Sequence, residues 1–339
     1  MRKLASIQEI FDIQPIENAD AIEKVSILGW HCVSKKGEFN IGDKCVYFEV
    51  DSFLPVDDKF EFLRAGSYKN NEYMGEGFRL KTQRFRGQIS QGLALPISIL
   101  PAGNYEIGDD VTDVLGVKKW DMPEMATSGG TAIGSKPFGI YTTDETRIQS
   151  IPEIVDIMQG KPYYISTKMD GTSVTYYVKD GVFGVCGRTL EYKDTDDCSF
   201  WQYAKKHSID VNMLAYNMNI AIQGEFCGGG IQKNRLKLKE PCFFAFNVLS
   251  LDNMKYYDFE AFINTCGELN ITTVPIEEVK DSFAYKTVDE LLERAKGNYD
   301  SGNKKEGIVI RPLKEEYCYL LSGRLSFKVL NNDFLLKQD

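Results

Sequence analysis

Residues 163–178 read YYISTKMDGTSVTYYV. Two runs rich in β-branched and aromatic residues, 163–167 and 172–178, favour strands, and Asp170-Gly171 between them favours a tight turn. Lys168 is therefore expected at the end of the first strand. A lysine before an Asp-Gly turn is common on protein surfaces, so its meaning depends on the rest of the chain.

The region around this stretch alternates further strands with a few helices. Strand-like runs lie at residues 182–186, 220–224, 242–249 and 307–311. Apolar residues at helical spacing lie at residues 201–207, 259–268 and 288–297. This pattern predicts an α+β domain built on antiparallel sheets, over residues 151–339.

The N-terminal part of the chain has a different pattern. Short strand-like runs separated by turn residues predict a small β-barrel over residues 1–120. These runs lie at residues 25–33, 44–50, 78–82 and 92–95. Glycine, serine and proline punctuate residues 121–150, which are predicted to form a linker. The glycines at 129 and 130 are not followed by the Gly-Lys-Ser/Thr of a P-loop.

Composition narrows the classes of protein further. The chain has 339 residues and a net charge of −9, which argues against a strongly basic nucleic-acid coat. Its eight cysteines include no C-x-x-C pair, and neither of its two histidines lies in a metal-site or triad motif. With no apolar run near the ~20 residues that cross a bilayer, we expect a cytoplasmic or nuclear protein without a membrane partner.

Two local basic clusters stand out against the acidic total. Nucleic-acid contact and a merely solvated face are both compatible with such clusters, and we expect the former. The first cluster contains Arg79, Lys81, Arg84 and Arg86, and the second contains Lys233, Arg235, Lys237 and Lys239, which would hold either the triphosphate or the RNA backbone. The cations expected to contact nucleic acid are Arg79, Lys81, Arg84, Arg86, Lys233 and Lys237.

Further candidate residues follow Lys168 in a fixed order. The set comprises Lys168, Asp170, Gly171, Arg188, Glu225, Phe246, Glu306 and Lys328. In its order this set resembles the motifs of the covalent nucleotidyltransferases, the superfamily of polynucleotide ligases and mRNA capping enzymes. Each residue alone is unremarkable in its place, whereas the ordered set is hard to obtain by chance.

A longer run narrows the resemblance to RNA ligases. Residues 224–234, GEFCGGGIQKN, are similar to the pattern G-E-x-x-G-P-G-I-Q-K of the phage and trypanosome-editing branch, with Gly229 in place of the proline. Residues 136–149 and the run RFRGQISQGL at 84–93 look like the RNA ligase type found in Deinococcus and Naegleria. That type carries an OB-like module before its nucleotidyltransferase domain, so the resemblance implies the same arrangement here.

The expected chemistry gives each candidate a role. A lysine attacks the α-phosphate of ATP only as the neutral amine, so the pKa of Lys168 must fall, and we expect Lys328 and a bound metal to lower it. Asp170, Glu225 and Glu306 would hold Mg²⁺ or Mn²⁺, directly or through water. Phe246, or Phe244 on the same strand face, could stack on adenine.

The remaining roles come from the backbone and from the family. Gly171 would let the backbone approach the nucleotide closely. The resemblance implies that Glu225 contacts the ribose and that Arg188 engages the nucleotide or the RNA end.

We therefore predict a monomeric, ATP-dependent RNA ligase that acts on nicked or broken RNA. It would join 3′-hydroxyl and 5′-phosphate ends through a lysyl-AMP and an adenylated 5′ end. One alternative is an mRNA guanylyltransferase, but there the OB domain follows the nucleotidyltransferase domain, and only eleven residues follow Lys328 here.

The other alternative is a non-catalytic nucleic-acid-binding protein, which would be expected to have lost the lysine and carboxylates. One departure bears on this choice: many relatives have Lys-x-Lys where this chain has Ser326-Phe327-Lys328, with Arg324 nearby.

Overall fold

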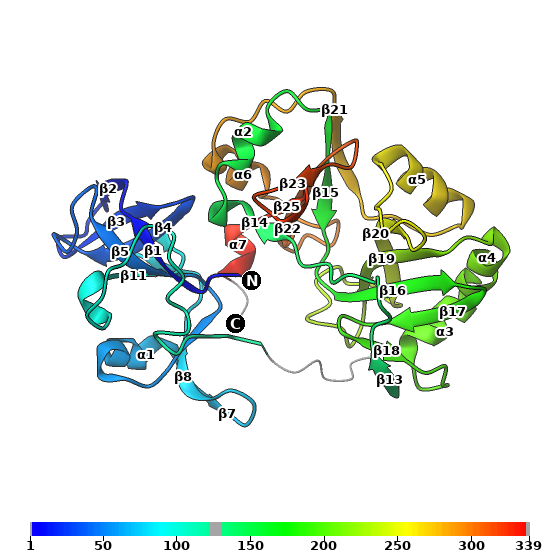
Figure 1. Ribbon diagram of the computed structural model, residues 1–339, viewed down its shortest axis with the longest axis horizontal. Coiled ribbons are helices and arrows are strands. Elements are labelled where there is room, and N and C mark those ends of the chain that lie inside the picture. The colour runs from blue at the N-terminus through cyan, green and yellow to red at the C-terminus, as the bar shows by residue number, and fades with distance from the viewer. Residues whose placement is uncertain (1, 122–129, 337–339) are drawn as a thin grey trace. The chain divides into compact units, whose positions relative to one another are not determined.

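The protein divides into two compact units. A computed structural model describes residues 2–121 and 130–336 (Figure 1). Unit 1 contains residues 1–123, 149–152 and 335–339, and unit 2 contains residues 124–148 and 153–334. Residues 122–129 lie outside the described residues. They belong to the predicted linker of residues 121–150.

Unit 1 is built from short strands that pair antiparallel. One sheet has the order β1 (Ala5–Glu9), β5 (Lys44–Phe48), β11 (Leu93–Pro96). A second has the order β12 (Lys118–Lys119), β6 (Ser52–Leu54), β8 (Gly75–Arg79), β7 (Tyr68–Asn71), and a third β2 (Asp12–Pro15), β3 (Ile22–Ile27), β4 (Trp30–Lys35). The hairpin of β9 (Gln83–Phe85) and β10 (Gln88–Ser90), the short helices η1 (Asp58–Leu63) and η2 (Ile97–Ile99), and α1 (Arg64–Ser67) complete the unit.

The predicted strand at residues 25–33 is instead a hairpin. Leu28 has φ 52°, and the backbone reverses at Leu28-Gly29 so that Ile27 faces Trp30. A side chain at Gly29 would place its Cβ 2.7 Å from the Cα of Gln149. Strand-like residues continue on both sides of Gly29, so the local composition did not mark this turn.

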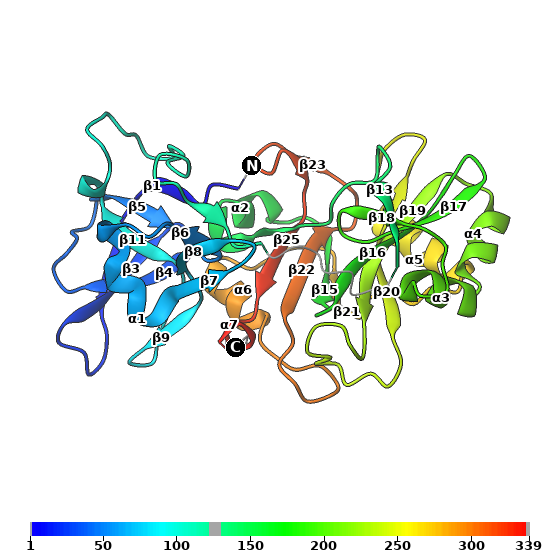
Figure 2. The ribbon, with the colours of Figure 1, turned by 90° about the horizontal axis from the view of Figure 1, so that it is seen from below.

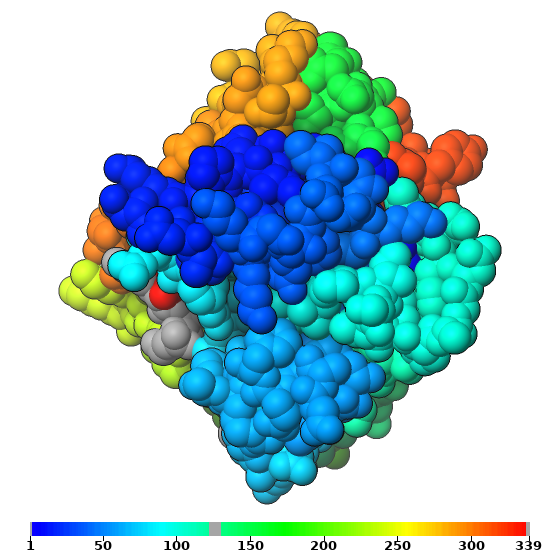
Figure 3. Space-filling view, turned by 90° about the vertical axis from the view of Figure 1, so that its left-hand side faces the viewer, coloured from blue at the N-terminus to red at the C-terminus, as the bar shows by residue number. Residues whose placement is uncertain are grey.

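Buried side chains from the whole length of unit 1 form its core. One cluster contains the fully buried side chains of Val46, Phe48, Phe60 and Phe78. Removing this apolar surface from water stabilises the unit. The first strand pairs with a segment about a hundred residues later, since the N–H of Val111 donates to the carbonyl of Ala5 at 2.9 Å. Figure 3 shows the dark blue and cyan surfaces of unit 1.

Unit 2 contains two larger sheets. The six-stranded sheet has the order β13 (Ala132–Ser135), β18 (Leu190–Tyr192), β17 (Val182–Cys186), β16 (Thr172–Lys179), β19 (Ile220–Cys227), β20 (Cys242–Ser250). The five-stranded sheet has the order β14 (Thr146–Arg147), β25 (Phe327–Leu330), β22 (Gly307–Pro312), β15 (Tyr163–Lys168), β21 (Ile276–Lys280). β14 pairs with β25 in parallel, and the other neighbours in these two sheets pair antiparallel.

Helices accompany both sheets, as the α+β prediction requires. Their bounds are η3 (Ile148–Ser150), α2 (Ile154–Met158), α3 (Ser199–Lys206), α4 (Ile209–Tyr216), α5 (Phe259–Glu268), α6 (Val288–Arg294) and α7 (Asn332–Leu335), and a small hairpin joins β23 (Tyr317–Cys318) to β24 (Gly323–Arg324). α3, α4 and α5 share a buried core with the six-stranded sheet, and α2 and α6 share another with the five-stranded sheet. The predicted fold class is confirmed.

The two sheets of unit 2 meet at residues 168–172. β15 ends at Lys168 and β16 begins at Thr172, so residues 169–171 carry the chain from the five-stranded sheet to the six-stranded sheet (Figure 2). Side chains from strands of both sheets can therefore meet near this connection.

Candidate active site

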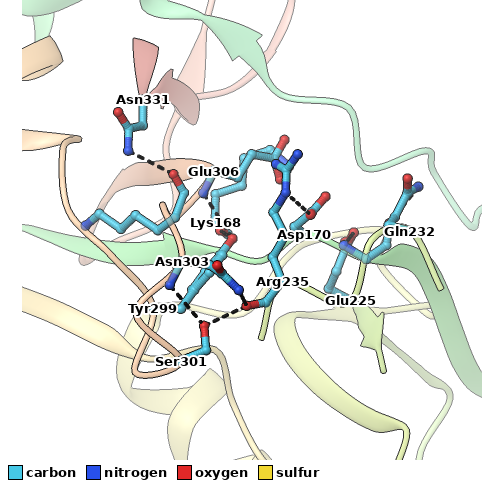
Figure 4. Close-up of polar contacts among 12 residues, drawn as sticks. Lys168, Asp170, Glu225, Gln232, Arg235, Tyr299, Ser301, Asn303, Glu306 and Asn331 are labelled. Atoms are coloured by element: carbon cyan, nitrogen blue, oxygen red, sulfur yellow. Dashed lines mark hydrogen bonds and ion pairs between the residues drawn. The ribbon is translucent and has the colours of Figure 1, made fainter. Parts of the chain in front are cut away.

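Lys168 lies beside Glu306 on the five-stranded sheet. The last register pair of β15 and β22 joins Lys168 to Gly307, which puts Glu306 one residue before β22. The Nζ of Lys168 donates to Oε2 of Glu306 at 2.9 Å (Figure 4). Both side chains are mostly buried, so the pair lies in an environment where charges interact strongly.

Glu225 comes from the six-stranded sheet. It follows a break in register between Gln223 and Gly224, where β19 pairs with β20, and such a break redirects the side chains that follow it. The backbone N–H of Gly171 donates to Oε1 of Glu225 at 3.2 Å. A Cβ at Gly171 would lie 2.4 Å from the carbonyl oxygen of Phe226, so glycine is required for this close approach.

Asp170 completes the carboxylates around Lys168. Its Oδ2 lies 3.7 Å from Nε of Arg235, whose guanidinium also stacks 4.1 Å from the centre of the Phe334 ring. The structure thus brings together Lys168, Asp170, Gly171, Glu225 and Glu306, although they come from positions 138 residues apart.

The charge state of Lys168 differs from the expectation. Burial opposes its charged form, but the carboxylates of Glu306 and Glu225 outweigh burial and raise the pKa of Lys168 above its ordinary value. Burial and the neighbouring Lys168 instead lower the pKa of Lys328 to about 8. The net shift of the Lys168 pKa is therefore upward in the protein alone, because the carboxylates outweigh the repulsion from Lys328, whereas the predicted lowering also involved a bound metal.

The carboxylates themselves are in an unfavourable environment. Burial and the Glu306 carboxylate raise the pKa of Glu225 to about 7, against the opposing effect of Lys168. Burial and Glu306 also raise the pKa of Asp170. Buried carboxylates that repel one another fit a hard divalent cation, which would relieve that repulsion.

The described residues nevertheless do not form a closed metal cage. Over residues 2–121 and 130–336, no group of three or more histidine, cysteine, aspartate or glutamate side chains is close enough to hold a metal ion. A cation at this site would have to complete its shell with water or with oxygens of a ligand, which is the usual preference of Mg²⁺.

Phe246 and Phe244 both lie close to these residues. Each is half-buried and packs against a small cluster that includes Met169 and Tyr299. Their similar exposure leaves both as possible stacking partners for a base.

Arg188 and Arg324 both have protein partners. Arg188 follows β17 and pairs with Asp144 at 2.9 Å. Arg324 donates to Oδ1 of Asn247 at 2.6 Å, pairs with Glu315 and stacks 4.1 Å from the centre of the Tyr256 ring. Arg324 is therefore engaged in another network, so it is not positioned as a simple replacement for the second lysine of the Lys-x-Lys pattern.

The basic residues of the N-terminal cluster are unequally exposed. Arg84 and Arg86 are exposed on the β9–β10 hairpin, whereas Arg79 and Lys81 are partly buried. Arg79 lies 4.9 Å from the centre of the Trp120 ring and 3.7 Å from Asp51.

Lys233 and Lys237 of the second cluster are exposed. Lys237 donates to the carbonyl of Ser301 at 3.1 Å, and Lys233 is close enough to lower the pKa of Asp170, though less than Arg235 does.

Several residues of the site were not predicted. Tyr299 and Asn331 hold the backbone around Lys168 and Glu306, and Ser301 and Asn303 hold the backbone of Arg235 (Figure 4). Most of these contacts involve main-chain atoms, which leave no mark in the sequence. Arg235 belongs to the predicted basic run from Lys233 to Lys239, but its ion pair with Asp170 was not predicted.

The strands of unit 1, followed by a lysine and carboxylates between two sheets, define a nucleotidyltransferase-like architecture. A family described as OB-fold domain matches residues 4–97, which confirms the predicted OB-like module. A family described as RNA ligase matches residues 161–330, half of the chain.

Solved structures of an RNA ligase from Naegleria gruberi cover 99% of this chain at 36% identity. The form with PPi has a TM-score of 0.88, with 99% of its own chain covered. A mutant with ATP and Mn has a TM-score of 0.90 and the same coverage, and an apo mutant has a TM-score of 0.89 with 98% of its chain covered. No curated protein matches. The chain belongs to the RNA ligase family, as its motifs predicted.

Family membership decides between the predicted alternatives at the level of enzyme class. The chain is an RNA ligase rather than a guanylyltransferase or a non-catalytic binding protein. Among the described residues, no helix is both long and apolar enough to cross a membrane.

Proposed function

We propose that this RNA ligase uses ATP and joins 3′-hydroxyl to 5′-phosphate ends through an adenylate on Lys168. The observation that carries the proposal is the position of Lys168, whose Nζ lies 2.9 Å from Glu306 among buried carboxylates. Structures of the Naegleria gruberi relative with ATP and Mn, with AMP and Mn, and with PPi support the use of ATP and a divalent metal.

The reaction has three steps. The Nζ of Lys168 loses a proton and attacks the α-phosphorus of ATP, forming an N–P bond as the bond to pyrophosphate breaks. A 5′-phosphate of RNA then attacks the same phosphorus, which frees Lys168 and leaves an adenylated 5′ end. A 3′-hydroxyl finally attacks the activated 5′-phosphorus and releases AMP.

Lys168 can react only when the surrounding negative charge is reduced. Its pKa is raised by Glu306 and Glu225, so the ammonium form dominates in the protein alone. A divalent cation held by Asp170, Glu225 and Glu306, directly or through water, would lower that pKa and offset charge on the phosphates.

The remaining site residues bind and orient the nucleotide. Phe246 stacks on adenine, Glu225 contacts the ribose, and Lys328 contacts the phosphates as a buried cation. Gly171 lets the backbone of residues 169–171 approach the nucleotide, and Arg188 exchanges Asp144 for the nucleotide or the RNA end. Positioning and charge stabilisation supply most of the rate, since the covalent chemistry needs only Lys168.

The proposal also assigns a role to each of three parts of the chain. Residues 1–120 form a nucleic-acid-binding module, residues 121–150 a linker, and residues 151–339 the adenylyltransferase domain, in a chain that acts as a monomer. Within the predicted linker, residues 132–135 and 146–147 extend the sheets of unit 2 and residues 149–152 belong to unit 1.

The exposed cations contact the RNA backbone in this proposal. Replacing Lys233 and Lys237 together by alanine should weaken RNA binding and lower the slope of log affinity against log salt by about 1 to 2. Replacing Lys314, an exposed lysine paired with Asp258, is the matched control. An unchanged slope in the double variant would show that this cluster is only a solvated face. The same measurement on Arg84 and Arg86 tests the N-terminal cluster, with Arg79 and Lys81 contributing less because they are partly buried.

A sealing assay tests the proposed function. The full chain is incubated with ATP, Mn²⁺ and a nicked duplex that carries a 5′-phosphate and either an RNA or a DNA 3′-hydroxyl end. We expect sealing of the RNA 3′-hydroxyl end with a transient adenylated 5′ end, and no sealing without ATP. Equal sealing without ATP, or sealing of DNA ends alone, would contradict the proposal.

A further inference from the structure

The hydroxyl of Tyr299 joins the backbones that carry Lys168 and Glu306. It donates to the carbonyl oxygen of Lys168 at 2.8 Å and accepts from the backbone N–H of Glu306 at 3.0 Å (Figure 4). The ladder between β15 and β22 ends at the pair Lys168 and Gly307. The hydroxyl therefore links the two segments just where direct pairing stops.

Both backbone polar groups of Glu306 are held in this way. Its N–H donates to Tyr299, and its carbonyl accepts from the backbone N–H of Asn331 at 2.9 Å. Asn331 is fully buried, and its side-chain Nδ2 also donates to the carbonyl of Lys305 at 3.0 Å. The carboxylate of Glu306 thus faces Lys168 from a fixed backbone.

Tyr299 is itself rigidly held. Its backbone N–H donates to the carbonyl of Asn303 at 2.8 Å, and its ring is buried with Met169 and Val274. Because packing fixes the ring, its hydroxyl holds the backbones of Lys168 and Glu306 in a fixed position relative to Tyr299.

The same turn also holds the neighbouring basic segment. The carbonyl of Arg235 accepts from Oγ of Ser301 at 2.6 Å and from Nδ2 of Asn303 at 2.7 Å. The turn at residues 299–303 is therefore bonded to three segments that are distant in sequence, those of Lys168, Glu306 and Arg235.

We propose that Tyr299 is a positioning residue for the attack of Lys168 on ATP. Its hydroxyl fixes the distance and direction between the lysine Nζ and the Glu306 carboxylate, while touching neither nucleotide nor RNA. This inference rests on the proposed function, since it concerns the step in which the N–P bond forms and pyrophosphate leaves. An error of about 1 Å in the attacking atom costs up to about a hundredfold in rate.

Tyr299→Phe removes the hydroxyl and keeps the packed ring. Tyr176→Phe is the matched control, because the hydroxyl of the fully buried Tyr176 donates to a backbone carbonyl, that of Phe200, at 3.2 Å on the six-stranded sheet. The single-turnover rate of protein labelling by α-phosphate-labelled ATP is measured against ATP concentration, well below the thermal midpoint of each variant.

We expect the rate at saturating ATP to fall about tenfold to a hundredfold in Tyr299→Phe, with the half-saturating ATP concentration changed less than about threefold. Tyr176→Phe should lose comparable thermal stability and keep the wild-type rate. A Tyr299→Phe rate within about twofold of wild type, an effect confined to half-saturation, or equal losses in both variants would overturn the inference. Absence of label on the wild-type protein would instead contradict the proposed function.

Discussion

Two buried charged clusters in unit 2 differ in how their charges are balanced. Arg311 is 2% exposed, and its guanidinium donates to Ser326, Tyr164, the carbonyl of Phe246 and Glu145, at 2.8 to 3.2 Å. Although burial acts to raise it, Arg311 and Arg324 lower the pKa of Glu145. The charges of Arg311 and Glu145 are therefore balanced by side chains of the same cluster.

The cluster around Lys168 has the opposite character. Glu225 is partly buried, and its pKa is raised to about 7 by burial and by Glu306, because the cation Lys168 is shared among several carboxylates. Perturbed groups of this kind gather at functional sites. The comparison predicts that the Arg311 cluster stabilises the fold, whereas the uncompensated charge of the Lys168 cluster is consistent with the proposed binding of substrate and metal.

Breaking the balanced cluster should have the largest effect on stability. Arg311→Met leaves Glu145 buried without its main partner, so the free energy of unfolding in urea should fall by about 3–5 kcal/mol. The double variant Arg311→Met with Glu145→Leu should recover most of the loss, because no unpaired charge remains. A loss below about 1 kcal/mol in the single variant would show that the cluster is not a stabilising network.

The same kind of change in the Lys168 cluster should behave differently. Glu225→Gln removes a repelling charge and retains an oxygen for the N–H of Gly171. Without divalent cation at pH 8, the raised pKa means that ionised Glu225 is unfavourable in the folded state, so stability should stay the same or rise.

Labelling of the Glu225→Gln variant by ATP should fall about a hundredfold. Stability is followed by urea unfolding and labelling by single-turnover kinetics. A stability loss as large as that of Arg311→Met would remove the contrast between the clusters.

A smaller effect concerns the charge of Lys328. Its folded-state pKa of about 8 lies below the unfolded value near 10.4, so the folded protein loses this charge first as pH rises. Folding stability from this group therefore increases between these pH values, whereas affinity for phosphates decreases.

Binding of an uncleavable ATP analogue should be constant below pH 8 and weaken by up to about tenfold per pH unit above it. Lys328→Arg should remain charged and show no bend in this range. Wild-type affinity that stays flat to pH 9.5 would exclude Lys328 as a titrating phosphate ligand.

Much of the fold and the core of the site could be predicted from local sequence. Lys168, Asp170 and Gly171 lie in one short turn, and Glu225 and Glu306 lie in runs whose strand character is strong, so their order carried the information. The hairpin at Leu28-Gly29 was missed because strand-like residues continue on both sides of the turn. The elements were thus predictable where composition changes at a boundary.

Interactions with main-chain atoms and the balance of charges could not be predicted. Tyr299 binds a carbonyl and an N–H that any residue at those positions would provide. The direction of the Lys168 pKa shift depends on how many carboxylates surround its Nζ, which only the three-dimensional arrangement of the two sheets determines. Lys305 is another example, since it lies in a charged run and is nevertheless buried against Glu277 at 2.6 Å.

The most direct test of the account is the covalent state of Lys168. The full chain and Lys168→Ala are incubated with ATP labelled at the α-phosphate and Mn²⁺, denatured, and separated from free nucleotide. We predict label on the wild-type protein, on the peptide that contains Lys168, and none on Lys168→Ala. Label retained by Lys168→Ala, or found on another residue of the wild-type protein, would show that Lys168 is not the nucleophile.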